Sequence, residues 1–540
     1  MEEFIFGTLA TDDLKLVHHR AGLSGLQHNH DLSPRDPLPG EPVTLTVRAG
    51  HDLDAQQVVC YYTTDNTEPK GSHGASENGF ALPLERAGVL WDTLAWGYIT
   101  LWQGTLPAQP EGTTVRYQIG AWSGEGSEVF ADWPDVQATA ERASSAFFRG
   151  EPLPSTPVGD PSQRHTFAFG IDRLAPPDWA RRSVIYQVFV DRFYPGRGRG
   201  WLQTTDLRGF CGGTLEGVLE KLDYVSDLGA DCLWLSPIFP SPSHHGYDAT
   251  DMEHVEPRLG GDDALHALVD AAHSRGIRVL LDLVCNHVSD RHPIFQEARA
   301  NPSSPHRAWF TFDDSEIGYR TFFAVRSMPQ VNLVHPGARA WMIDTALYWL
   351  REFDVDGYRL DYANGPGPDF WTDFWRACKA EKPDCYCFGE VVDAPASQQA
   401  YVGRLDGVLD FFAGDAIRRT LALRRWSEAH MERFLERHIR FFPETFLMPT
   451  FIDNHDMDRF LYLAGGDKVA LRRAAAVQMR LPGPPIIYYG TEVGLNQCRS
   501  TREGMGLHVC RVPMAWGGEQ DRELLAYYKE LIRERRCRSQ

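Results

Sequence analysis

Acidic side chains recur at the ends of short apolar runs in the second half of the chain. Asp361, Glu390 and Asp456 each stand at or just after such a run. Two carboxyl groups that differ in protonation can cleave a glycosidic bond, one as nucleophile or base and the other as general acid. The three residues are therefore the first candidates for chemistry.

The neighbouring residues in the sequence predict different environments for Asp361 and Glu390. Arg359 and Asp361 lie two residues apart, so on a strand both side chains point to the same side. A neighbouring guanidinium holds a carboxylate ionised, as a covalent nucleophile requires. Glu390 follows the apolar run 385–389, and burial there would raise its pKa, as a general acid requires.

His287 and His455 also stand at the ends of apolar runs. Any one of these acids alone could instead cap a helix or lie at the surface. Three carboxylates, two histidines and an arginine in equivalent places make that alternative weak.

Such residues need a scaffold that brings strand ends together. From about residue 182, apolar runs typical of buried strands alternate with helical patterns. The runs cover 184–190, 232–235, 279–284, 357–361, 385–389, 405–409, 446–452 and 485–489, and the helical patterns cover 215–228, 265–272, 341–353, 370–380, 469–481 and 524–532. They predict an α/β fold, a (β/α)8 TIM barrel, whose chemistry lies at the carboxyl ends of the strands. A doubly wound sheet is the alternative, but no glycine-rich phosphate turn follows the first run.

The rest of the chain divides by pattern. Residues 1–150 contain alternating runs such as 43–47 and 115–119, which predict an N-terminal β-sandwich. A proline-rich linker is expected at 151–180 and the catalytic barrel at 181–540. About fifty residues separate the third run from the next helix, so a small inserted domain is expected at 288–335.

Composition excludes several classes of partner. The 540 residues include 73 acidic and 54 basic side chains, a formal net charge of −19. This argues against nucleic acid and against an anionic membrane surface, and it suits a neutral ligand such as a sugar. The acidic start is unlike a secretory signal, and the ten cysteines are scattered, so a cytoplasmic location is expected.

Four aromatic residues cluster in the N-terminal region, namely Trp91, Trp96, Tyr98 and Trp102. They could form a glucan-binding surface or a lip over a cleft. The favoured interpretation is that they fill the sandwich core and its contact with the barrel, because large aromatic side chains are usually buried.

The residues at the strand ends stand in motifs that resemble those of the α-amylase family of glycoside hydrolases, over most of 182–536. Asp282-Leu-Val-Cys-Asn-His287, Gly357-Tyr-Arg-Leu-Asp-Tyr-Ala-Asn364, Gly389-Glu390 and Phe451-Ile-Asp-Asn-His-Asp456 are similar to its first four signatures. Met328-Pro-Gln-Val-Asn332 resembles a fifth signature in its neopullulanase, cyclomaltodextrinase and maltogenic amylase form. A C-terminal β-sandwich, usual in these relatives, is expected to be missing.

The resemblance implies hydrolysis of α-1,4-glucosidic bonds in maltooligosaccharides, cyclodextrins or related α-glucans, with retention, through a covalent glycosyl-enzyme. It implies that Asp361 is the nucleophile, Glu390 the general acid/base and Asp456 the carboxylate that stabilises the transition state. The substrate-binding residues that it implies are Tyr247, His287, Arg359 and His455, with Asp282 as structural support.

No cofactor and no metal are expected. The Asn/Asp-rich calcium loop of many relatives has no counterpart after the first strand, although Asn286 matches a calcium ligand of secreted amylases. The resemblance also implies an α-glucan oligosaccharide as substrate, and either glucan binding or a homodimer through the N-terminal domain.

Other activities stay open. A transglycosylase, a glucanotransferase or an α-glucosidase would use the same scaffold, and a non-catalytic glucan-binding protein would keep only the binding site. Gly365 stands where these relatives usually carry an acid, which bears on the acceptor side of the cleft and on the balance of hydrolysis and transfer.

Overall fold

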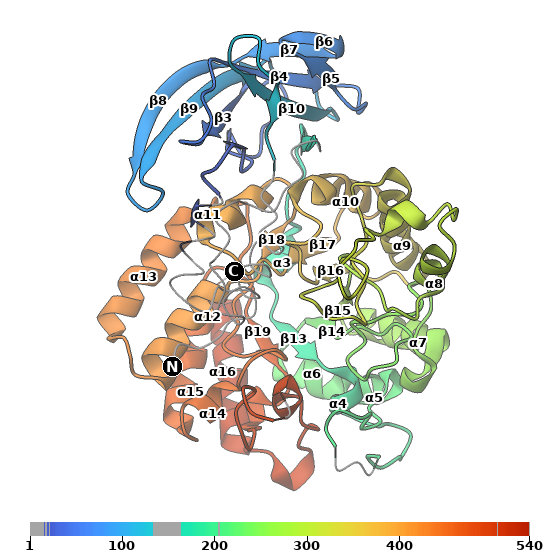
Figure 1. Ribbon diagram of the computed structural model, residues 1–540. Helices are drawn as coiled ribbons and strands as arrows, with labels where there is room; N and C mark the ends of the chain where they lie inside the picture. Colours follow the sequence, from blue (N-terminus) through green and yellow to red (C-terminus); the bar gives the residue numbers. More distant parts are fainter. Residues whose placement is uncertain are drawn as a thin grey trace. The chain divides into compact units, whose positions relative to one another are not determined.

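The computed structural model describes residues 16, 19–20, 22–132, 164–202, 206–504 and 506–538. It consists of two compact units (Figure 1). The first unit comprises Met1–Ala175, Gly365–Arg376 and Val392–Arg404, and the second comprises Pro176–Asn364, Ala377–Val391 and Leu405–Gln540. The expected boundary at residue 150 and about half of the expected linker lie outside the described residues, so the domain boundaries stay a prediction.

The first unit is built from antiparallel strands. One sheet contains β1 (Leu26–Gln27), β2 (Leu32–Ser33), β3 (Val43–Ala49), β8 (Glu85–Asp92) and β9 (Gly97–Leu106). A second contains β4 (Gln57–Thr63), β7 (Phe80–Pro83), β10 (Thr114–Trp122), β11 (Val129–Phe130) and β12 (Phe167–Gly170), and β5 (Lys70–Ser72) pairs with β6 (Ala75–Asn78). Leu45 and Val47 share one buried core with Cys60, Tyr117 and Ile119 of the second sheet. The predicted N-terminal β structure is confirmed.

The hairpin of β8 and β9 departs from expectation. Trp96 is 74% exposed, Tyr98 66% and Trp91 48%, whereas Trp102 is buried. The prediction that all four aromatics fill the core is therefore wrong for three of them. The reason lies in the pairing: β3 accompanies β9 only as far as Thr100, so the tip of the hairpin, a long curved pair in Figure 1, has no third strand beside it.

The second unit contains a curled parallel sheet. Its seven strands are β13 (Ile185–Val188), β14 (Cys232–Leu235), β15 (Arg278–Leu283), β16 (Gly357–Leu360), β17 (Tyr386–Gly389), β18 (Gly407–Val408) and β19 (Ile486–Tyr488). Their order is β18-β17-β16-β15-β14-β13-β19. Nearly every residue in them is buried, as expected where helices cover a parallel sheet. The predicted barrel-like α/β fold is confirmed.

The eighth expected strand, at 446–452, forms single parallel bridges instead of a continuous ladder. Leu447 bridges Gly407, and Thr450 bridges both Asp410 and Pro485, so the segment lies between β18 and β19. Pro449 has no N–H to donate, which limits the ladder at its centre. The segment closes the ring of strands without being a regular strand.

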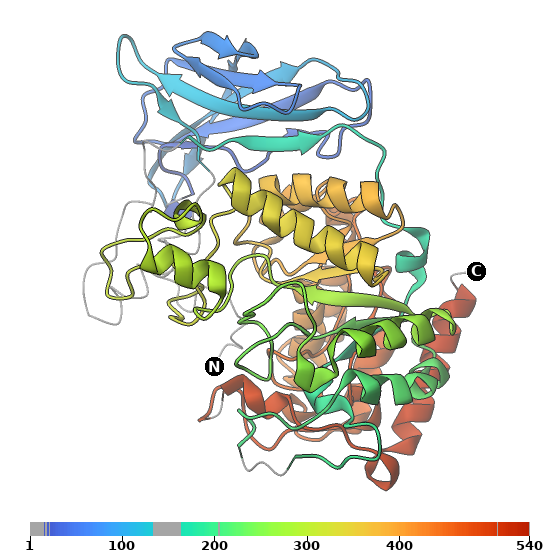
Figure 2. The ribbon, with the colours of Figure 1, turned by 90° about the vertical axis from the view of Figure 1, so that its right-hand side faces the viewer.

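Helices lie on the outer side of these strands (Figure 2). The described helices of the chain are α3 (Asp178–Arg182), α4 (Val190–Phe193), α5 (Leu215–Glu220), α6 (Leu222–Leu228), α7 (Gly261–His273), α8 (Pro293–Ala300), α9 (Pro336–Glu352), α10 (Pro368–Glu381), α11 (Pro395–Gln398), α12 (Phe411–Ile417), α13 (Glu428–Phe441), α14 (Phe460–Leu463), α15 (Lys468–Gln478) and α16 (Arg522–Arg538). Within the described part of the chain, no helix is both long and apolar enough to cross a membrane.

The helices that the sequence patterns did not predict include α8 and α13. In α13, Ser427 caps the N-terminus, and Met431, Leu435 and His438 form a narrow buried stripe on a largely charged helix. In the long segment after β15, α8 interrupts what reads as an irregular loop. That segment also returns to the strand end, where Gln330 bridges His287.

Candidate active site

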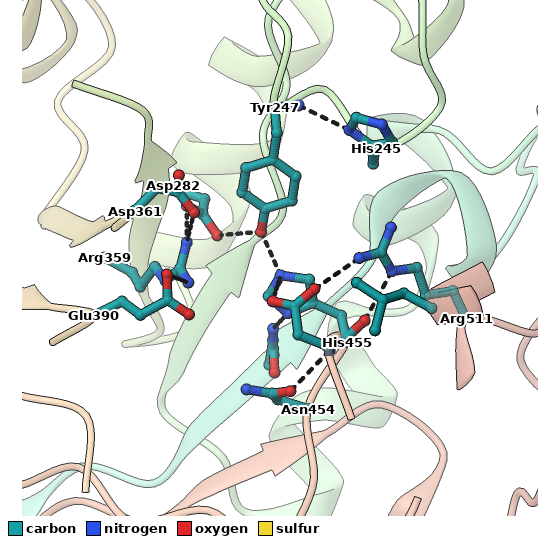
Figure 3. A network of polar contacts seen from close by, with 12 residues as sticks. His245, Tyr247, Asp282, Arg359, Asp361, Glu390, Asn454, His455 and Arg511 are labelled. Atoms are coloured by element: carbon teal, nitrogen blue, oxygen red, sulfur yellow. Dashed lines mark hydrogen bonds and ion pairs between the residues drawn. The ribbon is translucent and has the colours of Figure 1, made fainter. Parts of the chain in front are cut away.

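One buried guanidinium organises the carboxyl ends of three adjacent strands. Arg359 on β16 is fully buried and lies 2.7 Å from Asp282, 2.7 Å from Asp361 and 2.8 Å from Glu390 (Figure 3). Asp282 pairs with Arg359 in the parallel register of β15 and β16. Asp361 and Glu390 are the first residues after β16 and β17, so the sheet itself brings the four side chains together.

The third candidate carboxylate lies in a second cluster. Asp456 contacts Arg511 at 2.7 Å and His455 Nε2 at 2.9 Å. Arg511 also donates to the backbone carbonyl of His455 at 2.8 Å. Gln187 from β13 lies 2.7 Å from His455 Nδ1, so its amide fixes the orientation of the imidazole ring. Neither Arg511 nor Gln187 was predicted.

Tyr247 joins the two clusters. Its hydroxyl donates to Asp282 at 3.0 Å and lies 2.5 Å from His455 Nε2. The Tyr247 and His455 rings are parallel within 4°, with centroids 5.5 Å apart. Tyr247 thus presents a flat face beside the carboxylates, as Figure 3 shows.

His287 lies on the same strand end but makes other contacts. It is 1% exposed, its Nδ1 lies 3.2 Å from the Asn286 amide, and its ring stacks on Phe322 with centroids 4.8 Å apart. Phe322 in turn contacts Tyr362, the residue after Asp361, with centroids 5.0 Å apart. The predicted residues Tyr247, Arg359, Asp361, Glu390, His455 and Asp456 form one contact network. His287 lies at its margin, where a hydrogen bond to the backbone of Tyr247 connects it to the network.

The part of the chain that contains these residues is similar in sequence to known proteins. The model of the alpha amylase catalytic domain matches residues 187–523, which include every residue of the two clusters. The chain belongs to the alpha-amylase family. Alpha-amylase 2 of Dictyoglomus thermophilum is 40% identical over 369 residues, 68% of this chain and 65% of that protein. A cyclomaltodextrinase of Geobacillus thermopakistaniensis is 34% identical over 384 residues, 68% of this chain and 64% of that protein.

Among solved structures, a cyclomaltodextrinase superposes with a TM-score of 0.63 at 26% identity. The match covers 95% of this chain and 84% of that one. The sequence matches to the two curated relatives span less than two thirds of their own lengths.

In this alpha-amylase family site, the pKa values of the three candidate carboxyl groups are shifted in different directions. Burial raises the pKa of Asp361 to about 7, against the lowering effect of Arg359 and with a further rise from Asp282. Burial also raises the pKa of Glu390, again opposed by Arg359. Burial acts the same way on Asp456, but His455, Arg511 and Arg359 together lower its pKa well below the usual range. The expectation of a low pKa at Asp361 is therefore wrong, and Asp456 is the strongly acidic group.

The number of cations near each carboxyl group explains why the pKa is raised for Asp361 and Glu390 and lowered for Asp456. Asp282, Asp361 and Glu390 share a single guanidinium, so three negative charges cannot all be compensated there. Asp456 has its own cation in Arg511. Within the first cluster a proton is retained, and a buried carboxyl group that retains its proton near neutral pH can act as a general acid.

Among the described residues, no group of three or more His, Cys, Asp or Glu side chains is arranged to hold a metal ion. The Asn286 side chain, which matches a calcium ligand of secreted amylases, accepts a hydrogen bond from Gln330 at 3.0 Å. The expectation of no metal stays a prediction.

Proposed function

We propose that this member of the alpha-amylase family is a retaining glycoside hydrolase that cleaves α-1,4-glucosidic bonds in maltooligosaccharides, cyclodextrins or related α-glucans. One observation carries the proposal: the guanidinium of Arg359 contacts both Asp361 and Glu390. A shared guanidinium keeps two carboxyl groups close, and a short separation leaves room for direct attack by one of them but not for an intervening water.

In the first step, an Asp361 oxygen attacks the anomeric carbon of the sugar bound against Tyr247. The bond from this carbon to the glycosidic oxygen breaks, and that oxygen takes the proton of Glu390. The backbone N–H of Tyr362 donates to Glu390 Oε2 at 3.0 Å and holds the carboxyl group in place. The outcome is a covalent glycosyl-enzyme and a released sugar chain.

In the second step, Glu390 accepts a proton from water while the water oxygen displaces Asp361 from the anomeric carbon. Two inversions restore the α configuration, and Glu390 regains its proton. Asp456, held ionised, stabilises positive charge on the sugar ring in both transition states. Tyr247, His287 and His455 bind the sugar, in keeping with their hydroxyl and imidazole groups.

Transfer to a sugar hydroxyl would follow the same two steps with another acceptor. Transglycosylation, including glucanotransfer, is therefore the second candidate, and an α-glucosidase differs only in the length of substrate. The Phe322 and Tyr362 rings contact each other, and the backbone N–H of Tyr362 donates to Glu390, so an acceptor sugar would stack on this pair of rings. Products longer than the substrate would favour transfer.

The test is a time course of products from γ-cyclodextrin and soluble starch at equal mass, for the wild type and for Asp361→Asn. We expect maltose and glucose from the wild type and a loss of turnover of at least about 10³-fold in the variant, because the nucleophile is removed. Normal turnover by a folded Asp361→Asn would overturn the proposal. Binding of maltooligosaccharide without turnover by the wild type would instead support a non-catalytic role.

The N-terminal unit enters as part of the proposal. Its exposed hairpin, with Trp91, Trp96 and Tyr98, supports either glucan binding or a homodimer through this unit. Light scattering of the wild type and of Trp96→Ser distinguishes the two, since only a dimer would lose mass. A cytoplasmic location is supported by the ten cysteines, all described and none in a disulfide.

A further inference from the structure

Arg511, the cation of Asp456, stands on a stretch of chain without regular structure. The short helix Gly506–Cys510 ends just before it, and residues 511–516 form neither helix nor strand. A side chain on such a loop is placed less precisely than one on a strand, unless its surroundings hold it. The Arg511 guanidinium is nevertheless buried and lies 2.7 Å from Asp456 (Figure 3). Neighbouring side chains must therefore fix the backbone of Arg511.

Three buried side chains bind the backbone carbonyls on either side of Arg511. Arg459 Nε donates to the Cys510 carbonyl at 3.0 Å, and the Tyr488 hydroxyl donates to the same oxygen at 3.4 Å. The Tyr489 hydroxyl donates to the carbonyl of the residue that follows Arg511, at 2.6 Å. The loop is thus tied to the end of β19 and to Arg459.

Arg459 connects the parts of this arrangement. Its Nη1 donates to the Tyr489 carbonyl at 3.0 Å. Its guanidinium carbon lies 4.4 Å from the centre of the Tyr488 ring and 5.1 Å from that of the Tyr489 ring. Arg459 also follows Asp456 by three residues in the chain. One side chain therefore joins the segment that carries Asp456, the end of β19 and the loop that carries Arg511.

Stability alone does not account for an arginine at position 459. The side chain is fully buried, and its Nη2 has no hydrogen-bond partner. In the described part of the chain, no carboxylate forms an ion pair with Arg459; its guanidinium donates to two backbone carbonyls instead. A buried charge without a paired carboxylate is costly, and an apolar side chain of similar size would avoid this cost. Such a residue is expected where the geometry of a functional site depends on it.

We infer that Arg459 is a positioning residue of the reaction, which holds the backbone of Arg511 so that the guanidinium of Arg511 stays on Asp456. The inference rests on the proposed function, in which Asp456 stabilises positive charge on the sugar ring. This charge develops only in the transition states, so a displaced Arg511 should lower kcat and leave KM nearly unchanged.

The test is a double-mutant cycle of Arg459→Met and Arg511→Met. The rates are initial rates of reducing-sugar release from γ-cyclodextrin or soluble starch, whichever the wild type converts faster. We expect Arg459→Met to lower kcat about tenfold and to change KM by less than about twofold, because small displacements near the reacting centre have large effects on rate. The double variant should have a kcat within about twofold of that of Arg511→Met, because Arg459 then has no cation left to position.

Arg535→Met is the matched control. Arg535 on α16 is also buried, and its guanidinium donates to the backbone carbonyls of Leu481 at 2.7 Å and Gly483 at 2.8 Å. Both Arg459→Met and Arg535→Met should lower the midpoint of thermal unfolding, because each removes hydrogen bonds from buried carbonyls. Only Arg459→Met should lower kcat.

Several results would overturn the inference while the proposed function stands. They are a wild-type kcat or a loss confined to KM in folded Arg459→Met, losses of kcat that multiply in the double variant, and an equal loss of kcat in Arg535→Met. An unchanged kcat in Arg511→Met also overturns it, because the effect is argued to pass through Arg511. Turnover of neither glucan by the wild type overturns the proposed function itself.

Arg459→Lys serves if Arg459→Met does not fold. It keeps the buried charge but has one nitrogen in place of the three of a guanidinium, so it cannot reproduce the same hydrogen bonds. A lowered kcat that is not lowered further in combination with Arg511→Met supports the inference. A wild-type kcat, or losses that multiply, contradicts it.

Discussion

Replacing Arg359 by methionine tests the charge balance of the site. The side chain is fully buried and is the shared cation of Asp282, Asp361 and Glu390, at 2.7, 2.7 and 2.8 Å. Methionine fills a similar volume with an apolar chain and leaves these carboxyl groups without their cation. Both stability and activity should fall.

The magnitude follows from burial. Removing one partner of a buried ion pair costs about 3–5 kcal/mol, because the remaining charge is left uncompensated. The three contacts share one guanidinium, so their losses overlap and do not add. A loss of this size should lower the midpoint of thermal unfolding by roughly 5–15 °C.

The sign of the pH dependence is the decisive part. The folded-state pKa values of Asp361 and Asp282, about 7 and about 6, lie above their unfolded values, so stability falls as the pH rises through this range. Without Arg359 these pKa values rise further, and the fall continues to higher pH. The deficit of Arg359→Met should therefore be larger at pH 8 than at pH 5, where the carboxyl groups are protonated.

The assay is thermal unfolding followed by circular dichroism at both pH values. The control is Arg275→Met, which removes the surface partner of Asp223, and an exposed pair contributes at most about 1 kcal/mol. A deficit of equal size at pH 5 and pH 8 would refute the reasoning, because it would mean that Arg359 stabilises through packing alone.

Three further predictions follow from the site and the fold. The kcat/KM of the wild type should fall as the pH drops through about 7, because Asp361 must be ionised to attack. In Asp282→Asn this fall should occur at lower pH, because the charge of Asp282 raises the pKa of Asp361. A pH profile of kcat/KM that is unchanged in the variant would argue against this effect of Asp282. Arg511→Met should reduce kcat by about 10²–10³-fold in a rate assay, since it leaves the third carboxylate without its cation, and a reduction of less than about threefold would count against that role. In urea unfolding, Trp102→Ala should lower the free energy of unfolding by about 3–5 kcal/mol, because Trp102 is buried. The exposed Trp96→Ala should change it by no more than about 0.5 kcal/mol, and equal losses in the two variants would contradict this difference in burial.

Much of the site could be predicted from the sequence because the barrel couples pattern to position. A buried parallel strand reads as an apolar run, and the polar residue that follows it faces the common rim. Arg359, Asp361 and Glu390 were found in this way, and the structure brings them together at adjacent strands.

What could not be predicted depends on contacts between distant segments. Arg511 lies after β19 in a stretch without strand or helix periodicity, so nothing local points to its pairing with Asp456. The pKa of Asp361 depends on burial by elements that the spacing of Arg359 does not report. The exposed Trp96 follows from where β3 stops pairing, which alternation within β8 and β9 does not reveal.

The central claim is that Asp361 forms a covalent bond to the sugar. The most direct test is to incubate the enzyme with 5-fluoro-α-glucosyl fluoride, which slows release of the intermediate, and to map the modified peptide by mass spectrometry. We expect one added fluoroglucosyl group on the peptide that contains Asp361, and none in Asp361→Asn. A label on another residue, or products of inverted configuration with no label in the wild type, would contradict it.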